Sequence, residues 1–292
     1  MAWAFVGVLL FSFSVPLTKK AVGGFDPFLT ATGRAVIAGL LAAVILGIRR
    51  VLVPARRHWS LLFFTMLGAV FGWPILLALA LRHTTSAHVA VIAAFMPLAT
   101  AVIAVLRTHE RASWQFWAAA SAGTAALVAF AVSQGGASGG NVKADLLIVG
   151  AVLSSAWCYV LGASVTRAMP GWQVISWVVV LALPLTIPAS IVVWLETNGR
   201  YNPGAGAWTS LVLLGVSSMY VGFFAWYRGL ALAGIARGSQ VQQLQSLLTL
   251  GWSALLLGER ITASTVLAAL AVIVAVVWSQ RGRTTGSAVP QD

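Results

Sequence analysis

Six side chains with amide or hydroxyl groups form a stripe along one predicted face of the mainly apolar stretch 236–257. They are Ser239, Gln242, Gln243, Ser246, Thr249 and Ser253. If the stretch is an α-helix, these positions fall within an arc of about 120° at 100° per residue. Such groups would not face lipid, so we expect the stripe to face the interior of a helical bundle. We favour a role in lining a cavity for a polar ligand; the alternative is hydrogen bonding between neighbouring helices.

A second stripe is aromatic and could form the walls of a ligand site. Tyr220, Phe223, Phe224 and Tyr227 occupy positions i, i+3, i+4 and i+7 of one helix face. Aromatic walls suit an aromatic or amphipathic ligand, whereas the competing interpretation is packing within the bundle, with Tyr227 as an interfacial anchor. Together with residues on helices expected to face the same centre, the predicted substrate-binding set is Ser14, Trp73, Trp157, Tyr220, Phe224, Gln242, Gln243 and Ser246.

Three charged residues are expected to have structural or gating roles. Arg34 lies about six residues, or roughly 9 Å, inside an apolar stretch, where an arginine costs at least about 2.5 kcal/mol unless it is hydrated or paired. We favour snorkelling or hydrogen bonding to a neighbouring helix; the alternative is attraction of a substrate carboxylate. Glu110 and Glu259 each immediately precede an apolar stretch, and negative charge is favourable near the N-terminus of a helix.

The sequence carries no residue pattern typical of an enzyme. It contains no His-Glu-x-x-His and no phosphate-binding Gly-Lys-Ser/Thr motif. Its Gly-Ala-Ser-Gly-Gly at 136–140 matches Gly-x-Ser-x-Gly, but it lies in a glycine-rich linker and not between a strand and a helix. Its 6 carboxylates all fall in loops, at the ends of apolar stretches or in the tail, which leaves no carboxylate relay for protons within the membrane. We therefore expect no catalysis, no metal and no cofactor. A repeated selectivity filter or charged ring, which would indicate a channel, is also absent from the sequence.

Membrane-spanning helices must position these side chains. The chain is 60% hydrophobic and only 8% charged, which is too apolar for a soluble domain, and about 20 apolar residues span a bilayer core. Apolar stretches lie at roughly 2–18, 28–48, 59–81, 86–106, 114–133, 145–166, 172–195, 208–230, 236–257 and 262–279. They predict an all-α integral membrane protein with ten transmembrane helices, because each span must satisfy its own backbone in lipid.

Basic residues predict the orientation of these helices. With the N-terminus in the cytoplasm, the inner loops and the tail hold eleven Lys and Arg residues and the outer loops hold six. The positive-inside rule therefore predicts that both termini are cytoplasmic. We attribute the net charge of +12 to these loops, and not to binding of nucleic acid.

A short signature occurs twice, 149 residues apart. The copies read His109-Glu110-Arg111-Ala112-Ser113 and Gly258-Glu259-Arg260-Ile261-Thr262. A repeat of this size predicts two related halves. Five predicted helices separate the copies, and an odd number places the second copy in the opposite orientation across the membrane. The sequence therefore predicts two inverted five-helix repeats joined by the glycine-rich linker 134–141.

Several segments resemble the EamA-type members of the drug/metabolite transporter (DMT) superfamily. Leu256-Leu257-Gly258-Glu259-Arg260 is similar to the end of a half in that family, and Ala156-Trp157-Cys158-Tyr159 is similar to the opening helix of its second half. Arg34 resembles an arginine that is common in the family's second helix. The chain departs from the family at Ser246, the repeat partner of Pro97, where a proline is usual. The ninth helix is therefore expected to be straighter.

The resemblance implies a domain organisation and a function. Residues 1–138 would form the first EamA-like repeat, 142–280 the second and 281–292 a cytoplasmic tail. The family implies a secondary transporter of the bacterial inner membrane that exports small metabolites by alternating access, without a cofactor. The chain looks most like YddG-type exporters of amino acids, including aromatic ones.

Other possibilities stay open at this stage. A multidrug or cation efflux carrier of the same superfamily is the main alternative, and an intramembrane enzyme or a channel would belong to a different class. The expected partners are a small-molecule substrate and the lipid bilayer, and not nucleic acid. The sequence does not determine the substrate range, the coupling ion or the oligomeric state, although a monomer is compatible with it.

Overall fold

A computed structural model of the chain describes residues 2–108, 141–197, 200–233, 241–242 and 244–281, with a few further residues between 114 and 125. Every regular element in these ranges is a helix. The first half contains α1 (Ala2–Ser12), α2 (Ser14–Ala21), α3 (Pro27–Ile48), η1 (Arg56–His58), α4 (Trp59–Met66), η2 (Leu67–Gly72), α5 (Trp73–Ala80), α6 (Ser86–Ala93) and α7 (Met96–Thr108). The second half contains α9 (Val142–Val165), α10 (Gly171–Thr197), α11 (Ala205–Leu213), η3 (Leu214–Val221), α12 (Gly222–Ala233), α14 (Leu244–Leu257) and α15 (Ala263–Arg281).

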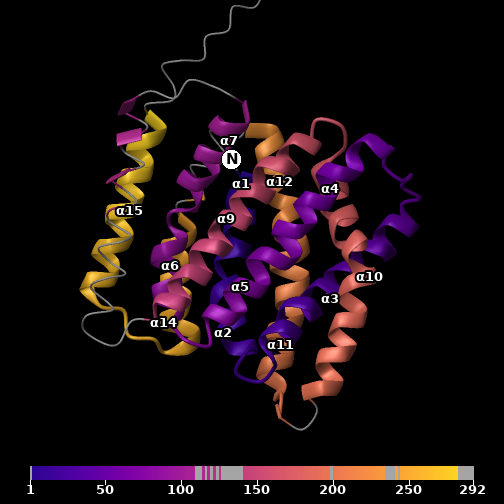
Figure 1. Cartoon of the computed structure of the whole chain (residues 1–292), viewed down its shortest axis with the longest axis horizontal. Coiled ribbons are helices and arrows are strands. Elements are labelled where there is room, and N and C mark those ends of the chain that lie inside the picture. The colour runs from indigo at the N-terminus through magenta and orange to yellow at the C-terminus, as the bar shows by residue number, and fades with distance from the viewer. Residues whose placement is uncertain are drawn as a thin grey trace, which may run out of the picture.

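Seven of the helical segments are long and apolar enough to cross a membrane. They are Ala2–Ala21, Pro27–Ile48, Arg56–Ala80, Ser86–Arg107, Val142–Val165, Gly171–Thr197 and Ala205–Leu232. Each coincides closely with an apolar stretch expected from the sequence. α14 is a shorter apolar helix, and most of the expected span at 114–133 lies outside the described residues. The helices run side by side as a bundle, and α15 stands at its edge (Figure 1).

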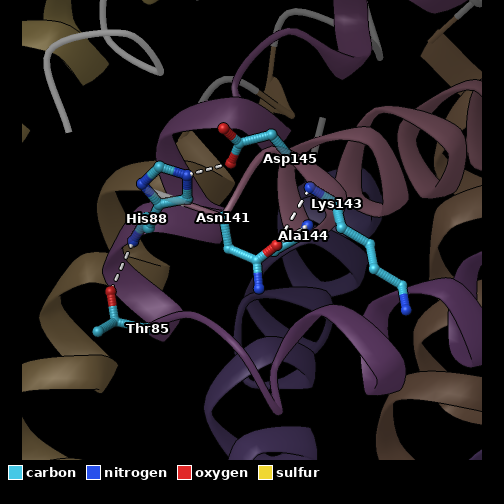
Figure 2. Close-up of polar contacts among 6 residues, drawn as sticks. All are labelled: Thr85, His88, Asn141, Lys143, Ala144 and Asp145. Carbon is cyan, nitrogen blue, oxygen red and sulfur yellow. Dashed lines mark hydrogen bonds and ion pairs between the residues drawn. The ribbon is translucent and has the colours of Figure 1, made fainter. Parts of the chain in front are cut away.

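Local sequence signals explain where several of these helices begin. Asp26 caps α3, since its Oδ1 accepts a hydrogen bond from the backbone nitrogen of Phe28 at 2.8 Å, and Pro27 follows at the first helical position. The Thr85 hydroxyl caps α6 in the same way. Asn141 caps α9 through its side-chain oxygen (Figure 2). These three caps satisfy backbone groups that a helix cannot satisfy within itself.

Two π-helical segments interrupt the third and the eighth expected spans. η2 precedes Trp73, and η3 contains Ser218, Met219 and Tyr220. The two segments overlap when the 149-residue repeat offset is applied to them. A π-helical turn changes which side chains face a given neighbour, and such turns occur often at functional sites. Here both segments contribute residues to the central cavity described below, Ala69 from η2 and Ser218 and Met219 from η3.

The helices of the two halves pack against one another in reciprocal pairs. α1 packs along α12, and its counterpart in the second half, α9, packs along α5. Similarly, α2 contacts α11, and α9 contacts α4. Among pairs of single elements, α3 and α10 share the most extensive interface. The crossing of α1 and α12 depends on glycine: a Cβ at Gly229 would collide with the backbone of Ala4. Small residues allow helices in a membrane to approach this closely.

Candidate functional site

A cavity at the centre of the bundle is built by both halves of the chain. Its lining residues are Phe11, Ser14, Arg34, Ala69, Trp73, Ser155, Tyr159, Ser218, Met219, Phe223 and Gln245. They come from α1, α2, α3, η2, α5, α9, η3, α12 and α14. The open space is about 20 Å³, which is room for about one water molecule. The cavity is therefore closed around its polar groups in this conformation.

Arg34 is the charged group of this cavity. Its side chain does not snorkel, because the residue is only 2% exposed. The guanidinium donates to the hydroxyl of Ser218 at 3.1 Å and to that of Ser14 at 3.5 Å, and its Nε has no partner. Within the part of the chain that the structure describes, no carboxylate pairs with it. A buried arginine held only by two neutral hydroxyls keeps most of its capacity to bind an anion.

Aromatic rings form the apolar wall of the cavity. Phe223 meets Phe11 edge to face, with ring centroids 5.0 Å apart, and it also contacts Tyr159 at 5.9 Å. Trp73 lies on the same lining and is buried. Rings in this arrangement offer a planar apolar ligand the contacts that aromatic groups prefer.

The prediction for Trp157 is wrong in its direction. Trp157 is 42% exposed on the outer surface of α9. The residues of α9 that line the cavity are Ser155 and Tyr159, four positions apart and hence on one helix face. The motif Ala156-Trp157-Cys158-Tyr159 lies on α9, which does line the cavity. Trp157 and Tyr159 are two positions apart, however, and two positions along a helix correspond to about 200° of rotation. Tyr159 therefore occupies the side that Trp157 was expected to face.

The described members of the polar stripe on the ninth expected helix are buried, but they make different contacts. Ser239 lies outside the described residues. Thr249 donates to the backbone oxygen of Ser12 at 3.1 Å, and Ser253 bonds back to Thr249. Gln242 and Ser246 are buried, and the Gln242 amide contacts the sulfur of Met96 at 3.3 Å. Neither lines the central cavity. Gln243 lies outside the described residues.

Gln245 is the residue of this segment that lines the cavity, and sequence reasoning missed it. It is buried, and its Oε1 has no hydrogen-bond partner. The ideal projection placed it about 40° beyond the edge of the stripe. That projection assumed one continuous helix, whereas α14 begins at Leu244 and Gln242 is a turn residue. If every glutamine in the expected span had been taken as a candidate, whichever helix face it lies on, Gln245 would have been included.

Tyr220 and Phe224 line a different hollow from Ser14 and Trp73. This hollow has a volume of about 330 Å³ and lies between α3, α10 and α12. Its lining consists of Ile45, Arg49, Trp172, Tyr220, Phe224 and Arg228. The Tyr220 hydroxyl is hydrogen-bonded to Ser176 at 2.9 Å. The predicted substrate-binding residues are therefore divided between two spaces, which we call the central cavity and the Arg49 hollow.

The end of the bundle opposite the Arg49 hollow is tied together by charged groups. We call it the Glu259 end, after the residue between α14 and α15 whose carboxylate accepts backbone hydrogen bonds from Ser86 and Ala87, each at 2.9 Å. Lys19 of α2 donates to the backbone oxygens of Leu81 at 2.6 Å and Thr84 at 2.7 Å. Lys19 from the first half of the chain therefore binds the loop before α6, and Glu259 from the second half binds the start of α6.

A third polar contact joins α6 to α9 at the Glu259 end. His88 Nε2 lies 2.6 Å from Asp145 Oδ1 (Figure 2). Asp145 lies in the first turn of α9, four residues after the Asn141 cap (Figure 2), so this turn is fixed where it meets α6. The Glu259 end therefore connects α2, α6, α9 and the loop before α15.

Glu259 contacts a different helix from the one that its sequence position suggested. Its sequence position suggested an interaction with the helix that follows, α15. The structure instead places its carboxylate at the N-terminus of α6, in the other half of the chain. The first turn of α15 is capped by the hydroxyl of Thr262. Glu110 lies outside the described residues.

The fold and the site define a helical membrane protein with a polar cavity at the junction of two halves. The model of the EamA-like transporter family matches this chain twice, over residues 1–132 and 142–280. The chain belongs to the EamA-like transporter family, and it is a membrane transporter. This confirms the resemblance seen in the sequence at the level of the family, but it does not distinguish a YddG-type specificity.

A curated relative and a solved structure agree with this assignment. The chain is 40% identical over 277 residues to the "Uncharacterized transporter YdeK" of Bacillus subtilis (strain 168), and the match covers 95% of each chain. It is also similar in fold to a solved structure described as "Crystal structure of protein", with a TM-score of 0.67 and 18% sequence identity. That match covers 95% of this chain and 96% of the solved one.

Proposed function

We propose that this transporter exports small metabolites, namely amino acids including aromatic ones, across the bacterial inner (cytoplasmic) membrane by alternating access. The central cavity is the observation that carries the proposal. Among the described residues, it brings an arginine without a counter-ion, several hydroxyl groups and an unpaired amide oxygen next to aromatic walls. An aromatic amino acid has a charged end and an apolar end, and a mostly apolar site with a few placed polar groups suits such a ligand.

The proposed architecture consists of ten helices in two inverted five-helix repeats. Reciprocal packing supports it, because the first helix of each half lies against the third helix of the other half. The matching π-helical segments η2 and η3 support it as well. In such an architecture the substrate binds at the junction of the repeats and the two halves rock around it.

Alternating access fits the unequal ends of the bundle. The central cavity is closed, and the Glu259 end is held by the bonds of Lys19, His88 and Glu259. The Arg49 hollow opens at the other end. With both termini in the cytoplasm, as the positive-inside rule predicts, the Glu259 end would face outward and would have to release these bonds to discharge substrate.

The main alternative within the superfamily is a carrier of cationic drugs. Such a substrate would need a carboxylate or a purely aromatic cage at its positive charge. Among the described residues, the central cavity offers Arg34 as its charged group and no carboxylate. A cation would therefore meet a positive charge, which disfavours this alternative.

The test is uptake of labelled L-phenylalanine into liposomes that contain the purified full-length chain. We expect saturable uptake that unlabelled aromatic amino acids inhibit, and counterflow when the liposomes are preloaded with unlabelled substrate. Empty liposomes and a panel of organic cations serve as controls. Conductance without saturation would indicate a channel and overturn the carrier proposal. Saturable transport of the cations alone would overturn the proposed substrate.

Facilitated or weakly proton-coupled transport is expected in the same assay. The described residues place no carboxylate in the central cavity, so a proton relay through the site has no visible carrier. An imposed pH gradient should therefore change the steady-state accumulation only slightly. Strong accumulation driven by the gradient would contradict this part of the proposal.

A further inference from the structure

Arg34 is an unusual charge for the interior of a membrane protein. The residue is 2% exposed, it lies well inside α3, and among the described residues it has no counter-ion. Charges within membrane segments are rare, usually paired, and often mark the path of a substrate. Arg34 has instead two neutral hydroxyl partners and a free Nε. Its incomplete pairing requires an explanation.

A purely structural arginine would be expected to use its five donors on fixed acceptors. Two backbone carbonyl groups between α5 and α6 satisfy Lys19 in this way. Arg34 contacts only side-chain hydroxyls, and one of these contacts is 3.5 Å long. Hydroxyl groups can rotate and can themselves donate, so Ser14 and Ser218 can hold the guanidinium and still turn toward an arriving anion.

We propose that Arg34 binds the carboxylate of the substrate, with Ser14 and Ser218 as flanking donors, and that the unpaired Oε1 of Gln245 accepts a hydrogen bond from the substrate's amino group. This inference rests on the proposed function and specifies the chemistry of the same site. A planar guanidinium fork matches a carboxylate in two parallel hydrogen bonds. The carboxylate would also supply the negative charge that the cavity lacks.

The remaining lining determines what the substrate carries beyond its polar end. Phe11, Trp73, Tyr159 and Phe223 surround the polar groups with rings. The site therefore selects a monocarboxylate with an apolar or aromatic side chain, and Gln245 favours those that also carry an amino group. Because the closed cavity holds about one water molecule, binding requires a more open state of the bundle.

The decisive comparison uses two ligands that differ only in charge, 3-phenylpropionate and its neutral amide, 3-phenylpropanamide. Binding to the purified full-length chain in detergent at pH 7, where the acid is ionised, is measured by titration calorimetry. We expect the carboxylate to bind at least about tenfold more tightly than the amide, because charge-assisted hydrogen bonds are the stronger ones. Equal affinity of the wild-type protein for the two ligands would overturn the proposal, whatever the variants do.

Variants then assign this preference to Arg34. Arg34→Gln should reduce the difference between carboxylate and amide to below about threefold, whereas Arg34→Lys should restore part of it. Arg200→Gln is the matched control, since it removes one arginine from an exposed loop and should leave the difference unchanged. A thermal unfolding curve for each variant shows that the protein is folded. A full preference in folded Arg34→Gln would overturn the role of Arg34.

Two further ligands test the rest of the site. Gln245→Leu should weaken L-phenylalanine by about tenfold and leave 3-phenylpropionate, which has no amino group, almost unaffected. An equal loss for both ligands would overturn the role of Gln245. Inorganic phosphate should compete poorly with 3-phenylpropionate, and competition at similar concentrations would overturn the role of the aromatic walls.

Failure of this inference can be distinguished from failure of the proposed function. If liposomes show no amino acid flux but the protein still prefers the carboxylate through Arg34, the proposed substrate fails and the anion site stands. If phenylalanine is transported without any preference for a carboxylate, the proposed function stands and the inference about Arg34 is wrong.

Discussion

Arg34 and Glu259 are both charged residues of this transporter, but their surroundings differ in a way that separates function from structure. Glu259 has both carboxylate oxygens occupied by backbone N–H groups at the start of α6. Arg34 is more deeply buried, has weaker partners and keeps a free donor. A charged group that makes all of its hydrogen bonds within the protein stabilises the fold, whereas a buried charged group with unmade hydrogen bonds costs stability. In the proposed site, the substrate carboxylate would complete the bonds of Arg34.

The largest expected effect is that of Arg34→Met on transport. Phenylalanine flux should fall by more than about 100-fold, since the substrate loses its charge-assisted partner. Thermal stability should stay the same or rise, because an incompletely paired buried charge is replaced by an apolar side chain of similar length. Flux into liposomes and an unfolding curve measure the two quantities. A variant that unfolds at a clearly lower temperature would place Arg34 with the structural charges.

Glu259→Ala should have the opposite profile. It leaves the first backbone N–H groups of α6 without a partner and removes a negative charge from that helix terminus, which should destabilise the protein by about 1.5–3 kcal/mol. Substrate binding in the central cavity should persist at temperatures where the variant is folded. Denaturant unfolding and calorimetry with L-phenylalanine provide the two measurements. An unchanged unfolding midpoint would show that water replaces the carboxylate and that this end is less closed than described.

Lys19→Met tests whether the Glu259 end behaves as one unit. The variant loses two hydrogen bonds from an ammonium group to backbone oxygens, with an expected cost of about 1–2 kcal/mol. Lys19 and Glu259 bind the same short segment, 81–87, and their opposite charges attract each other, so the double variant should cost less than the sum of the two single ones. Strict additivity in a double-mutant cycle would mean that the two residues stabilise separate parts of the structure.

The smallest effect is expected at the contact between His88 and Asp145. Both side chains are mostly buried, at 13% and 19% exposed, and the loss of one such hydrogen bond costs about 0.5–1.5 kcal/mol net. Asp145→Asn should therefore lower the unfolding midpoint slightly and leave the Kd for L-phenylalanine unchanged. Asp26→Asn, at the cap of α3, is a control with similar chemistry. A large change in substrate affinity would connect this contact with the central cavity.

Sequence patterns predicted much of the fold, because the bilayer imposes a simple rule on composition. Each of the seven long spans was visible as an apolar stretch, since a helix in lipid must be apolar over its whole length. The interruptions within the spans were not visible. Neither η2 nor η3 has a sequence signal of its own, because π-helical turns depend on packing with neighbouring helices. Gly68 in η2 shows how close this packing is, since a Cβ there would lie 2.5 Å from the backbone oxygen of Ser154.

The candidate site could be predicted only in part. Ser14, Trp73 and Arg34 were all singled out from the sequence and meet in the central cavity. Trp157 was not correctly placed, and Tyr159 and Gln245 were missed. An ideal helix projection gives the relative directions of side chains within one helix, but it does not give the rotation of that helix against the others. For the same reason, the projection did not predict that Tyr220 and Phe224 line the Arg49 hollow and not the central cavity. Their segments, η3 and α12, contribute residues to both spaces.

The sequence by itself determined that this protein lies in a membrane, that its helices fall at these positions, and that it belongs to a family of transporters. Composition and the positions of the apolar stretches carry the first two conclusions, and the match to the family model carries the third. Only the tertiary structure decided which charges are satisfied. Ser218 is far from Arg34 in the sequence, as Ser86 is from Glu259, and no local rule connects them. Hydrogen bonds depend on position to within a fraction of an ångström, and that position exists only after the helices have packed.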